Sequence, residues 1–355
     1  MAGRDRSKPM PVKHWSFAGL LLTYWCNARC ASCYVCSGPQ AGGDADVESA
    51  LALWEGLAAA SPHGCRIHIG GGEPFGRWET LIELARRARA AGLGPLQAVE
   101  TNAFWATDAA TVRDRLAALD AAGMGRLTIS ADPYHQQFVP IERVRLAARV
   151  GEEVLGPGRV RLRWRDWAES GFDTDRLTAT RRRELFAEFA RRRRDRIAGR
   201  AADQLAAGLE LMPARAFADI SCRQPLLRSR HVHIDGDGII CPGTCAGIIL
   251  GRGVSAASVG EIWRALSTAF ADTNDSRTAP GAGQDRPARA GCFELVSLLA
   301  QSGPAALMNL AGEMGYRPRG EGYAARCHLC WDVRRWLFEN GSFRDQLGPA
   351  VVYRP

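Results

Sequence analysis

The chain has 355 residues, of which 46% are hydrophobic and 24% are charged. This composition excludes an intrinsically disordered protein and provides enough chain for one large domain and a smaller one. The longest apolar stretch, residues 17–22, is far too short to cross a bilayer, and residues 1–14 lack the apolar segment of a secretory signal. We therefore expect a cytoplasmic protein without a membrane partner.

The formal charge of +8 raises the question of a nucleic-acid partner. Many of the arginines fall in residues 181–200, where Leu185, Phe186, Phe189 and Ile197 lie on one helical stripe. A solvated amphipathic helix explains this pattern, so we do not expect nucleic-acid binding, and an RNA-modifying enzyme remains a minor alternative.

From residue 16 to about residue 200, apolar runs of strand length alternate with helical patterns. Strands are predicted at residues 17–24, 66–69, 96–101, 126–131 and 160–164. Helices are predicted between them at residues 47–60, 78–91, 109–122 and 141–150. Such units indicate a parallel sheet covered by helices, which can close into a barrel with its chemistry at the carboxyl ends of the strands.

The sequence pattern changes after residue 200, where short segments are separated by Gly, Pro and Cys. A loop is predicted at residues 273–291 and a Gly/Pro-rich joint at residues 317–322. We therefore divide the chain into an N-terminal extension (1–15), a core barrel (16–200) and a second domain (201–355).

Eleven cysteines are unusual for a cytosolic chain without a metal. Cys26, Cys30 and Cys33 follow the first strand with the spacing CxxxCxxC. Three thiolates can hold three irons of a [4Fe–4S] cluster, which leaves the fourth iron open to chelate the amino and carboxylate groups of S-adenosylmethionine (SAM). Alternatives for these three cysteines are a zinc knuckle, for which Cys36 is the only local fourth ligand, and buried structural thiols. Cys65, outside the motif, is expected to be a small core residue.

The second strand runs into Gly70, Gly71, Gly72, Glu73 and Pro74. Glycines permit close backbone approach to a ligand, and the carboxylate could accept hydrogen bonds from an ammonium group. Taken alone the string is a weak signal, because Gly/Pro turns are common.

Polar residues follow the later strands as well. Thr101 and Asn102 end the third strand, and Ser130 ends the fourth. Arg163 and Arg165 are two residues apart on the fifth strand and are therefore predicted to lie on one face, where they could bind the carboxylate of SAM. The alternative for each is ordinary surface or turn chemistry.

An acid, a phenol and an imidazole stand together after the fourth strand, at Asp132, Tyr134 and His135. Their position facing the predicted site suggests a general base or a substrate-binding group. A structural hydrogen bond is an equally good explanation.

A second set of cysteines comprises Cys222, Cys241, Cys327 and Cys330, with a predicted hairpin turn at residues 233–238 between the first two. Four thiolates would close the coordination of one auxiliary cluster. Cys245 or Cys292 could replace one of the four, and a zinc ribbon is the main alternative.

The CxxxCxxC motif at Cys26, Cys30 and Cys33 resembles that of the radical SAM superfamily, although Ser32 stands where the family usually has an aromatic residue. The resemblance implies a partial (β/α)6 TIM-like barrel. It further implies SAM contacts from the GGEP string, from residues after the third strand and from the Ser of the SxD sequence at Ser130 and Asp132. Residues 199–201 resemble a GRA string that often follows the barrel, and the second cysteine set resembles the twitch domain, a shortened SPASM domain with one auxiliary [4Fe–4S] cluster.

The resemblance also implies the activity. An external one-electron reductant of the flavodoxin or ferredoxin type would reduce the first cluster, SAM would be cleaved to a 5′-deoxyadenosyl radical, and the radical would take hydrogen from substrate. Modification of a peptide or protein is the leading hypothesis, and a small-molecule radical dehydrogenase or oxidase is the alternative. A non-catalytic iron–sulfur protein would require four protein ligands on every cluster.

Overall fold

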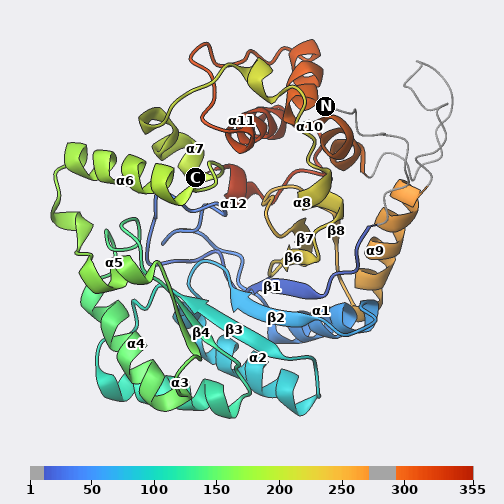
Figure 1. The fold of residues 1–355 in the computed structure, drawn as a ribbon. Coiled ribbons are helices and arrows are strands. Elements are labelled where there is room, and N and C mark those ends of the chain that lie inside the picture. Colours follow the sequence, from blue (N-terminus) through green and yellow to red (C-terminus); the bar gives the residue numbers. More distant parts are fainter. Residues whose placement is uncertain (1–11, 272–292, 355) are drawn as a thin grey trace.

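The computed structural model describes residues 12–271 and 293–354, and a single eight-stranded sheet runs through it (Figure 1). The order of the strands is β5-β4-β3-β2-β1-β6-β7-β8. Their bounds are Phe17–Leu21, Arg66–Gly70, Leu96–Thr101, Leu127–Ser130, Val160–Arg163, His231–Ile234, Ile239–Pro242 and Gly251–Arg252 for β1 to β8. The predicted loop at 273–291 and Cys292 lie outside the described residues.

Strands β1 to β6 are parallel, and helices α1 to α4 cover one face of this part of the sheet (Figure 1). Their bounds are Val47–Ala60, Trp78–Ala90, Ala109–Ala121 and Ile141–Leu155. Each agrees with its predicted helix apart from the C-terminus of α4, which runs five residues beyond residue 150. The predicted α/β architecture with a parallel sheet is therefore confirmed.

The sixth parallel strand does not come from the expected part of the chain. After β5, Trp164 adopts a left-handed conformation (φ 59°), and the chain enters the helix α5 (Arg165–Ser170). The strand β6 comes from beyond residue 200 and pairs with β1 at the opposite side of the sheet, so β5 is an edge strand and the barrel stays open between β5 and β6. The division of the chain at residue 200 remains a prediction, and the sheet continues across it.

A tight turn joins β6 to the antiparallel strand β7, as the sequence predicted. The carboxylate of Asp235 accepts hydrogen bonds from the backbone of Asp237 (3.0 Å) and Ile239 (2.9 Å). Gly238 has a positive φ of 77°, which glycine adopts without strain.

Of the remaining α-helices, α9 packs beside α1 and β8, and α10 packs against α8 and α11 (Figure 1). Their bounds are Ala179–Arg193, Arg200–Gln204, Arg223–Leu227, Ala256–Ala271, Glu294–Glu313, Arg326–Glu339 and Ala350–Tyr353 for α6 to α12. Short 3-10 helices occupy Pro74–Arg77, Thr174–Arg176, Ala206–Gly208 and Ala214–Phe217.

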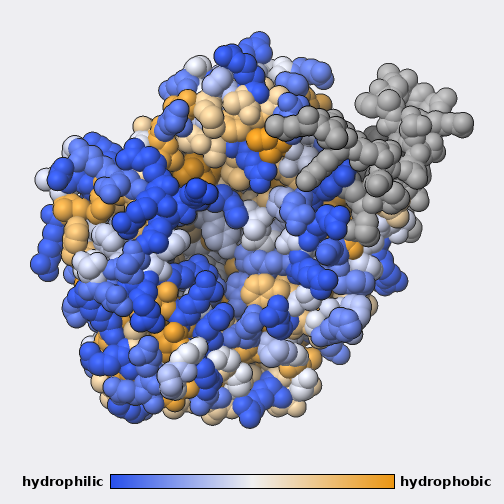
Figure 2. Space-filling view, in the orientation of Figure 1, coloured by the Kyte–Doolittle hydropathy of each residue, from blue (hydrophilic) through white to orange (hydrophobic). Residues whose placement is uncertain are grey.

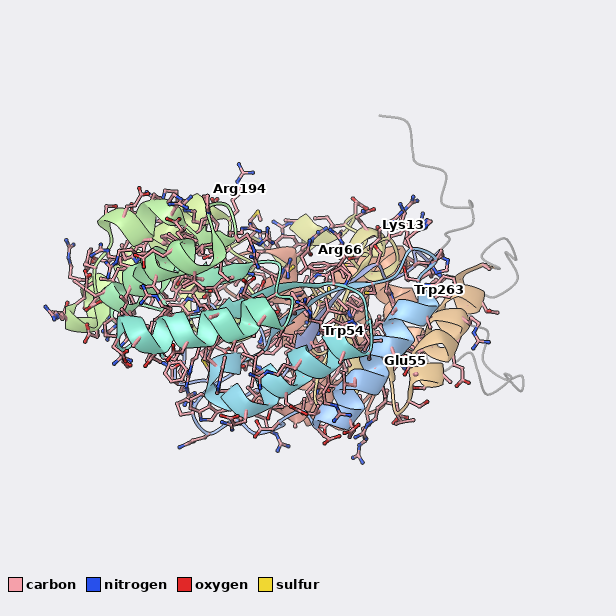
Figure 3. The ribbon with its side chains drawn as sticks, turned by 90° about the horizontal axis from the view of Figure 1, so that it is seen from below. Lys13, Trp54, Glu55, Arg66, Arg194 and Trp263 are labelled. Atoms are coloured by element: carbon pink, nitrogen blue, oxygen red, sulfur yellow. The ribbon has the colours of Figure 1, made fainter. Side chains whose placement is uncertain are left out.

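The arginine-rich segment forms the amphipathic helix α6, with Phe186 and Phe189 buried. Ile197 is also buried, but it lies beyond the end of α6 and therefore does not belong to its stripe. Arg194 directly follows the last residue of α6, and its side chain points away from the protein in Figure 3.

Helix α9 packs against α1 beside the sheet (Figure 3). A Cβ atom on Gly56 of α1 would lie 2.4 Å from the carbonyl oxygen of Ala256, so the two helices can approach this closely only at a glycine. The indole nitrogen of Trp263 on α9 donates to the carbonyl oxygen of Lys13 (3.2 Å), which holds the start of the described chain here. Among the described residues, no helix has the length and apolarity to cross a membrane.

Candidate iron–sulfur and cofactor site

A cavity of about 590 Å³ lies on the inner face of the open barrel. Because side chains alternate along a strand, every second residue of β1 to β6 faces it. Figure 2 shows this face of the molecule hollowed near its centre, with largely hydrophilic side chains around the hollow. The inner positions are polar on several strands, including His68, Glu100, Thr128, Arg161, Arg163, His231 and His233.

The loop that follows β1 (residues 22–38, the cluster loop) brings Cys26, Cys30 and Cys33 to this cavity. Cys36 does not join them: it has a φ of 59° and lines a separate cavity with Arg29. No other cysteine of the described chain lines the cavity beside these three. This arrangement matches the predicted three-thiolate site.

The spacing of the three sulfur atoms does not fit a single zinc ion. Two thiolates on one zinc ion, each about 2.3 Å from the metal, cannot be more than about 4.6 Å apart. Within residues 12–271 and 293–354, no three thiols have their sulfur atoms within 4.8 Å of one another. The pKa values of Cys26 and Cys30 are raised chiefly by burial, so these thiols gain from a cationic iron partner.

The glycine string after β2 packs directly on the cluster loop. The backbone N–H of Gly72 donates to the carbonyl oxygen of Thr23 (2.7 Å), and that of Glu73 donates to Trp25 (2.9 Å). A Cβ atom on Gly72 would lie 2.0 Å from the carbonyl oxygen of Trp25. Glycine is therefore required here for contact between two loops, and Gly71 and Gly72 both line the cavity.

The side chain of Glu73 is fully buried and does not line the cavity, and neither does Pro74. Its carboxylate accepts hydrogen bonds from the Thr101 hydroxyl (2.8 Å) and the backbone N–H groups of Asn102 (2.7 Å) and Phe75 (3.1 Å). Burial raises the pKa of Glu73 to about 7, against the opposing effect of these hydrogen bonds. The structure thus places Glu73 as a link between the ends of β2 and β3, away from the cavity surface.

Asn102 connects the end of β3 to the cluster loop. Its side-chain amide donates to the side-chain oxygen of Asn27 (2.8 Å) and lies 3.7 Å from the sulfur of Cys26. Thr101, Asn102 and Ser130 all line the cavity, so the structure brings these predicted cofactor-binding residues together with the thiols.

Asp132, Tyr134 and His135 also line the cavity, but they are engaged with one another and with the protein. Nδ1 of His135 lies 2.7 Å from the Asp132 carboxylate. Burial opposes protonation of His135, but Asp132 and Cys30 outweigh it and raise the histidine pKa well above its usual value. The Tyr134 hydroxyl donates to the carboxylate of Asp195 (2.7 Å). These contacts agree with the structural alternative, and a catalytic role for the three residues remains a prediction.

The predicted arginine pair is not formed. Arg163 is the last residue of β5, lines the cavity, and donates to Glu100 (2.7 Å). Because the left-handed Trp164 ends the strand, Arg165 begins α5 and does not line the cavity. The prediction that both arginines share one strand face was therefore wrong.

Arg200 fixes the cluster loop through hydrogen bonds to its backbone, a role that was not predicted from the sequence. The guanidinium is buried, and it donates to the carbonyl oxygens of Cys30 (3.0 Å), Cys36 (2.9 Å) and Ser37 (2.8 Å). A Cβ atom on Gly199 would lie 2.7 Å from the carbonyl oxygen of Cys33, so both residues of this pair fit against the loop. The signal in the sequence was the GRA string itself.

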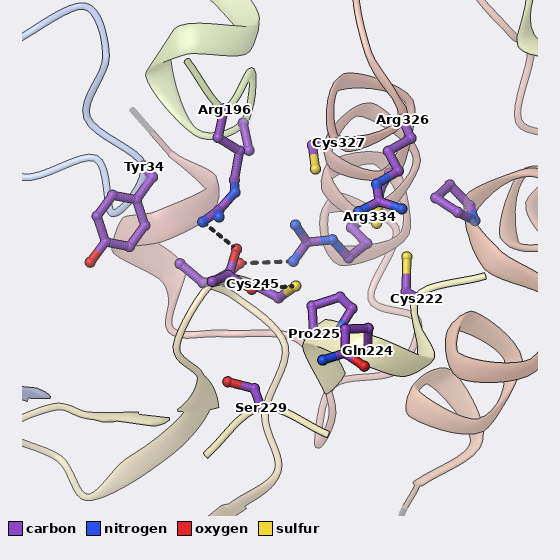
Figure 4. Close-up of a pocket in the computed structure, with 15 residues that line it drawn as sticks. Tyr34, Arg196, Cys222, Gln224, Pro225, Ser229, Cys245, Arg326, Cys327 and Arg334 are labelled. Carbon is purple, nitrogen blue, oxygen red and sulfur yellow. Dashed lines mark hydrogen bonds between the residues drawn. The ribbon is translucent and has the colours of Figure 1, made fainter. Parts of the chain in front are cut away.

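A second cavity, of about 360 Å³, lies between the helices α8 and α11 and the loop after β7. Four cysteines line it: Cys222, Cys245, Cys327 and Cys330. Figure 4 shows the thiols of Cys222, Cys245 and Cys327 pointing into one space. The structure thus brings together three of the four predicted auxiliary ligands, and Cys245 lines the cavity in place of the fourth, Cys241.

Cys241 does not line this cavity. It lies within β7, buried opposite His233 on β6, whereas Cys245 lies in the loop that follows and is free to turn toward α11. Sequence spacing alone named both as candidates, and only the pairing of β7 separates them.

A buried arginine accompanies the four thiols. Arg334 donates to the carbonyl oxygen of Ala246 (2.9 Å) and to the hydroxyl of Tyr353 (2.9 Å), and Figure 4 shows its guanidinium among the cysteines. Burial raises the pKa of Cys330 to about 11, and Arg334 acts in the opposite direction. Four thiols beside one buried cation form a suitable donor set for an anionic iron–sulfur cluster.

The comparisons with known proteins agree with an iron–sulfur site. Residues 18–141 match the family model described as "4Fe-4S single cluster domain". The prediction of a [4Fe–4S] cofactor is therefore confirmed. The matched range contains Cys26, Cys30 and Cys33, and their role as its ligands remains a prediction. No curated protein sequence matches the chain.

Solved structures give more distant matches. A crystal structure of BtrN in complex with AdoMet and 2-DOIA matches with a TM-score of 0.43 and 16% identity, over 74% of this chain and 89% of that chain. Native anSMEcpe with bound AdoMet and Cp18Cys peptide matches with a TM-score of 0.41 and 11% identity, over 91% of this chain and 97% of that chain. Similarity at this level identifies no substrate.

We predict that Arg200→Met releases the cluster loop. The change leaves the carbonyl oxygens of Cys36 and Ser37 without a donor, at a cost of about 1–3 kcal/mol for each unsatisfied group, whereas that of Cys30 keeps the N–H of Cys33 (3.1 Å). The variant should melt at a lower temperature and lose iron faster than the unmodified protein during anaerobic dialysis. Arg194→Met, at an exposed arginine, is the matched control, and equal iron retention by the two variants would contradict the role of Arg200.

We predict that Cys245→Ala removes about half of the bound iron, whereas Cys241→Ala leaves the iron content unchanged. Only the first of these thiols lines the second cavity. The measurement is iron per chain after anaerobic reconstitution, with zinc measured in the same samples. Iron loss from Cys241→Ala alone would restore the assignment made from spacing.

Proposed function

We propose that this chain is a radical SAM enzyme whose first [4Fe–4S] cluster is held by Cys26, Cys30 and Cys33. One observation carries the proposal: in the part of the chain that the structure describes, these are the only cysteines lining the barrel cavity. A cluster held this way keeps one iron for an exchangeable ligand. When bound, the reduced cluster supplies the electron that splits SAM, and the resulting 5′-deoxyadenosyl radical takes a hydrogen atom from the substrate.

The residues around the thiols would bind and orient SAM. Gly71 and Gly72, together with the polar side chains of Asn102 and Ser130, line the same cavity as the cysteines. Arg163, the single arginine of the predicted pair that reaches the cavity, is the cation available for a carboxylate, although it already pairs with Glu100. The concave sheet around these groups would keep water away from the reacting atoms.

An auxiliary [4Fe–4S] cluster is assigned by this proposal to Cys222, Cys245, Cys327 and Cys330. Four thiols close its coordination, so it would serve electron transfer or scaffolding. Tyr34, Arg196 and Thr244 line both cavities and form the wall between them. An external flavodoxin- or ferredoxin-type protein would deliver the electrons.

The substrate is proposed to be a peptide or protein side chain. Oxidation of a polar small molecule is the second candidate, and the polar lining of the cavity supports it. Arg126, Arg161 and Arg163 line the strand side of the cavity together with the histidines of β2 and β6. An apolar substrate would leave these groups desolvated without partners, so either candidate substrate must present polar groups to them.

Replacing Cys26, Cys30 and Cys33 together with Ala is predicted to abolish 5′-deoxyadenosine release from SAM under reducing conditions, because no thiols remain to hold the first cluster. Cys65→Ala is the control, since Cys65 is buried at the start of β2 outside the cavity. Deoxyadenosine is measured by chromatography with mass detection. Release by the triple variant at the rate of the control would refute the proposed cluster site.

Deuterium transfer is expected to identify the substrate class. Incubation with deuterated peptide pools and, separately, with deuterated polar small molecules such as amino sugars should give deuterated 5′-deoxyadenosine from one class only. Mass spectrometry of the nucleoside reads the result directly. Transfer from the small molecules alone would replace the leading substrate proposal by the second.

A further inference from the structure

Three histidines meet on the inner face of the barrel, apart from the cysteines. His68 lies on β2, and His231 and His233 lie on β6, while β1 runs between these two strands. The register places both His68 and His233 opposite Gly19 of β1. Two strands that are not neighbours therefore send imidazoles across a third.

Gly19 is what allows the rings to meet. A Cβ atom on this residue would lie 2.2 Å from Cδ2 of His233 and 2.5 Å from Nε2 of His68. Any other residue at this position would push the two rings apart. Phe17, two residues earlier on the same face, stacks on His68 (4.9 Å between ring centroids) and on His231 (4.6 Å), which fixes the orientation of both rings.

The ligating atoms converge. One ring nitrogen from each histidine lies within 4.8 Å of the other two, and Nε2 of His68 is 3.0 Å from Nε2 of His231. Two ligands of one metal ion, each about 2.0–2.1 Å from it, are separated by about 2.9–3.4 Å when the angle at the metal is near 90–109°. The observed separation falls in that range.

Hydrogen bonding between the rings leaves one buried atom, Nδ1 of His68, without a partner. If Nε2 of His68 donates to His231, then Nδ1 of His68 is an acceptor, and this buried atom has no hydrogen-bond donor. Its nearest charged neighbour is the carboxylate of Glu100 at 3.6 Å, which can only accept. The tautomer that suits Glu100 carries the proton on Nδ1 of His68, and its Nε2 lone pair then either accepts a hydrogen bond from Nε2–H of His231 or binds a metal ion.

We propose that His68, His231 and His233 form a binding site for a single divalent transition-metal ion such as Zn²⁺ or Co²⁺. Neutral imidazole is a ligand of borderline ions of this kind. Glu100 would orient His68 through its Nδ1–H, as carboxylates behind metal-bound histidines commonly do, and Arg163 holds Glu100 in place (2.7 Å).

The site shares the large cavity with Cys26, Cys30 and Cys33, but no sulfur atom of the described chain belongs to this group of converging atoms, and the proposal does not depend on the proposed activity. Three nitrogen ligands leave at least one coordination position, and all three histidines line the large cavity. That position would accept an oxygen or nitrogen donor of a molecule held in the cavity.

The test uses the reconstituted full-length protein with its clusters oxidised, in which state [4Fe–4S] clusters give no electron paramagnetic resonance signal. The protein is equilibrated with Co²⁺ and desalted, and the cobalt is counted by elemental analysis and observed by its high-spin signal. We expect about one Co²⁺ per chain. The cobalt content should fall to less than about a fifth of an ion per chain in each of the variants His68→Gln, His231→Gln and His233→Gln. Glu100→Gln should weaken Co²⁺ binding by about 10- to 100-fold. The control His14→Gln should leave the cobalt content unchanged.

Iron content and melting temperature of each variant show whether the fold is intact. Should a histidine variant fail to fold, X-ray absorption of cobalt in the unmodified protein decides the question, since the proposal requires three nitrogen neighbours at about 2.0–2.1 Å. Absence of Co²⁺ from the unmodified protein, retention of Co²⁺ by all three histidine variants, or sulfur neighbours around the cobalt would each overturn the proposal. None of these outcomes depends on SAM cleavage.

Discussion

The arrangement of the first cluster site depends on a buried cation that fixes a cysteine-bearing loop from outside it. The Arg200 guanidinium donates to three carbonyl oxygens of the cluster loop, and the loop itself has little regular structure. Buried carbonyl groups without partners would be costly, so the arginine and the loop stabilise each other. On the opposite side, the backbone after β2 reaches the same loop because Gly72 has no side chain. The positions of the three thiols follow from these two contacts.

The open barrel offers a polar interior to whatever binds beside the cluster. In a closed barrel, large apolar side chains fill the inner layers. Here β5 and β6 do not pair, and the inner positions carry His, Arg and Glu side chains around a cavity of about 590 Å³. These groups have few partners of their own, and the histidines among them are close enough to share an ion. Such an interior is suited to ligands that supply charge or hydrogen-bonding groups.

The second cavity adjoins the first, and the wall between them consists of Tyr34, Arg196 and Thr244, which line both. Because β6 belongs to the same sheet as β1, the loop after β7 lies directly beside the cluster loop. The predicted boundary at residue 200 therefore separates two stretches of sequence that share one sheet. Because the sheet is shared, the two thiol sites lie on either side of this wall.

The sequence by itself determined the local features: the alternation of β1 to β5 with α1 to α4, the hairpin turn at Asp235, and the cysteine motif with its cluster. These depend on periodicity, turn residues and short spacings, which act over a few residues. Tertiary structure alone decided which distant groups meet. It placed β6 beside β1, selected Cys245 over Cys241, withdrew Glu73 and Arg165 from the cavity, and brought His68 to His231 and His233 across Gly19. The physical reason is that strand pairing and loop packing join residues far apart in the sequence, 163 positions in the case of His68 and His231, and no local pattern encodes which partner each strand will take.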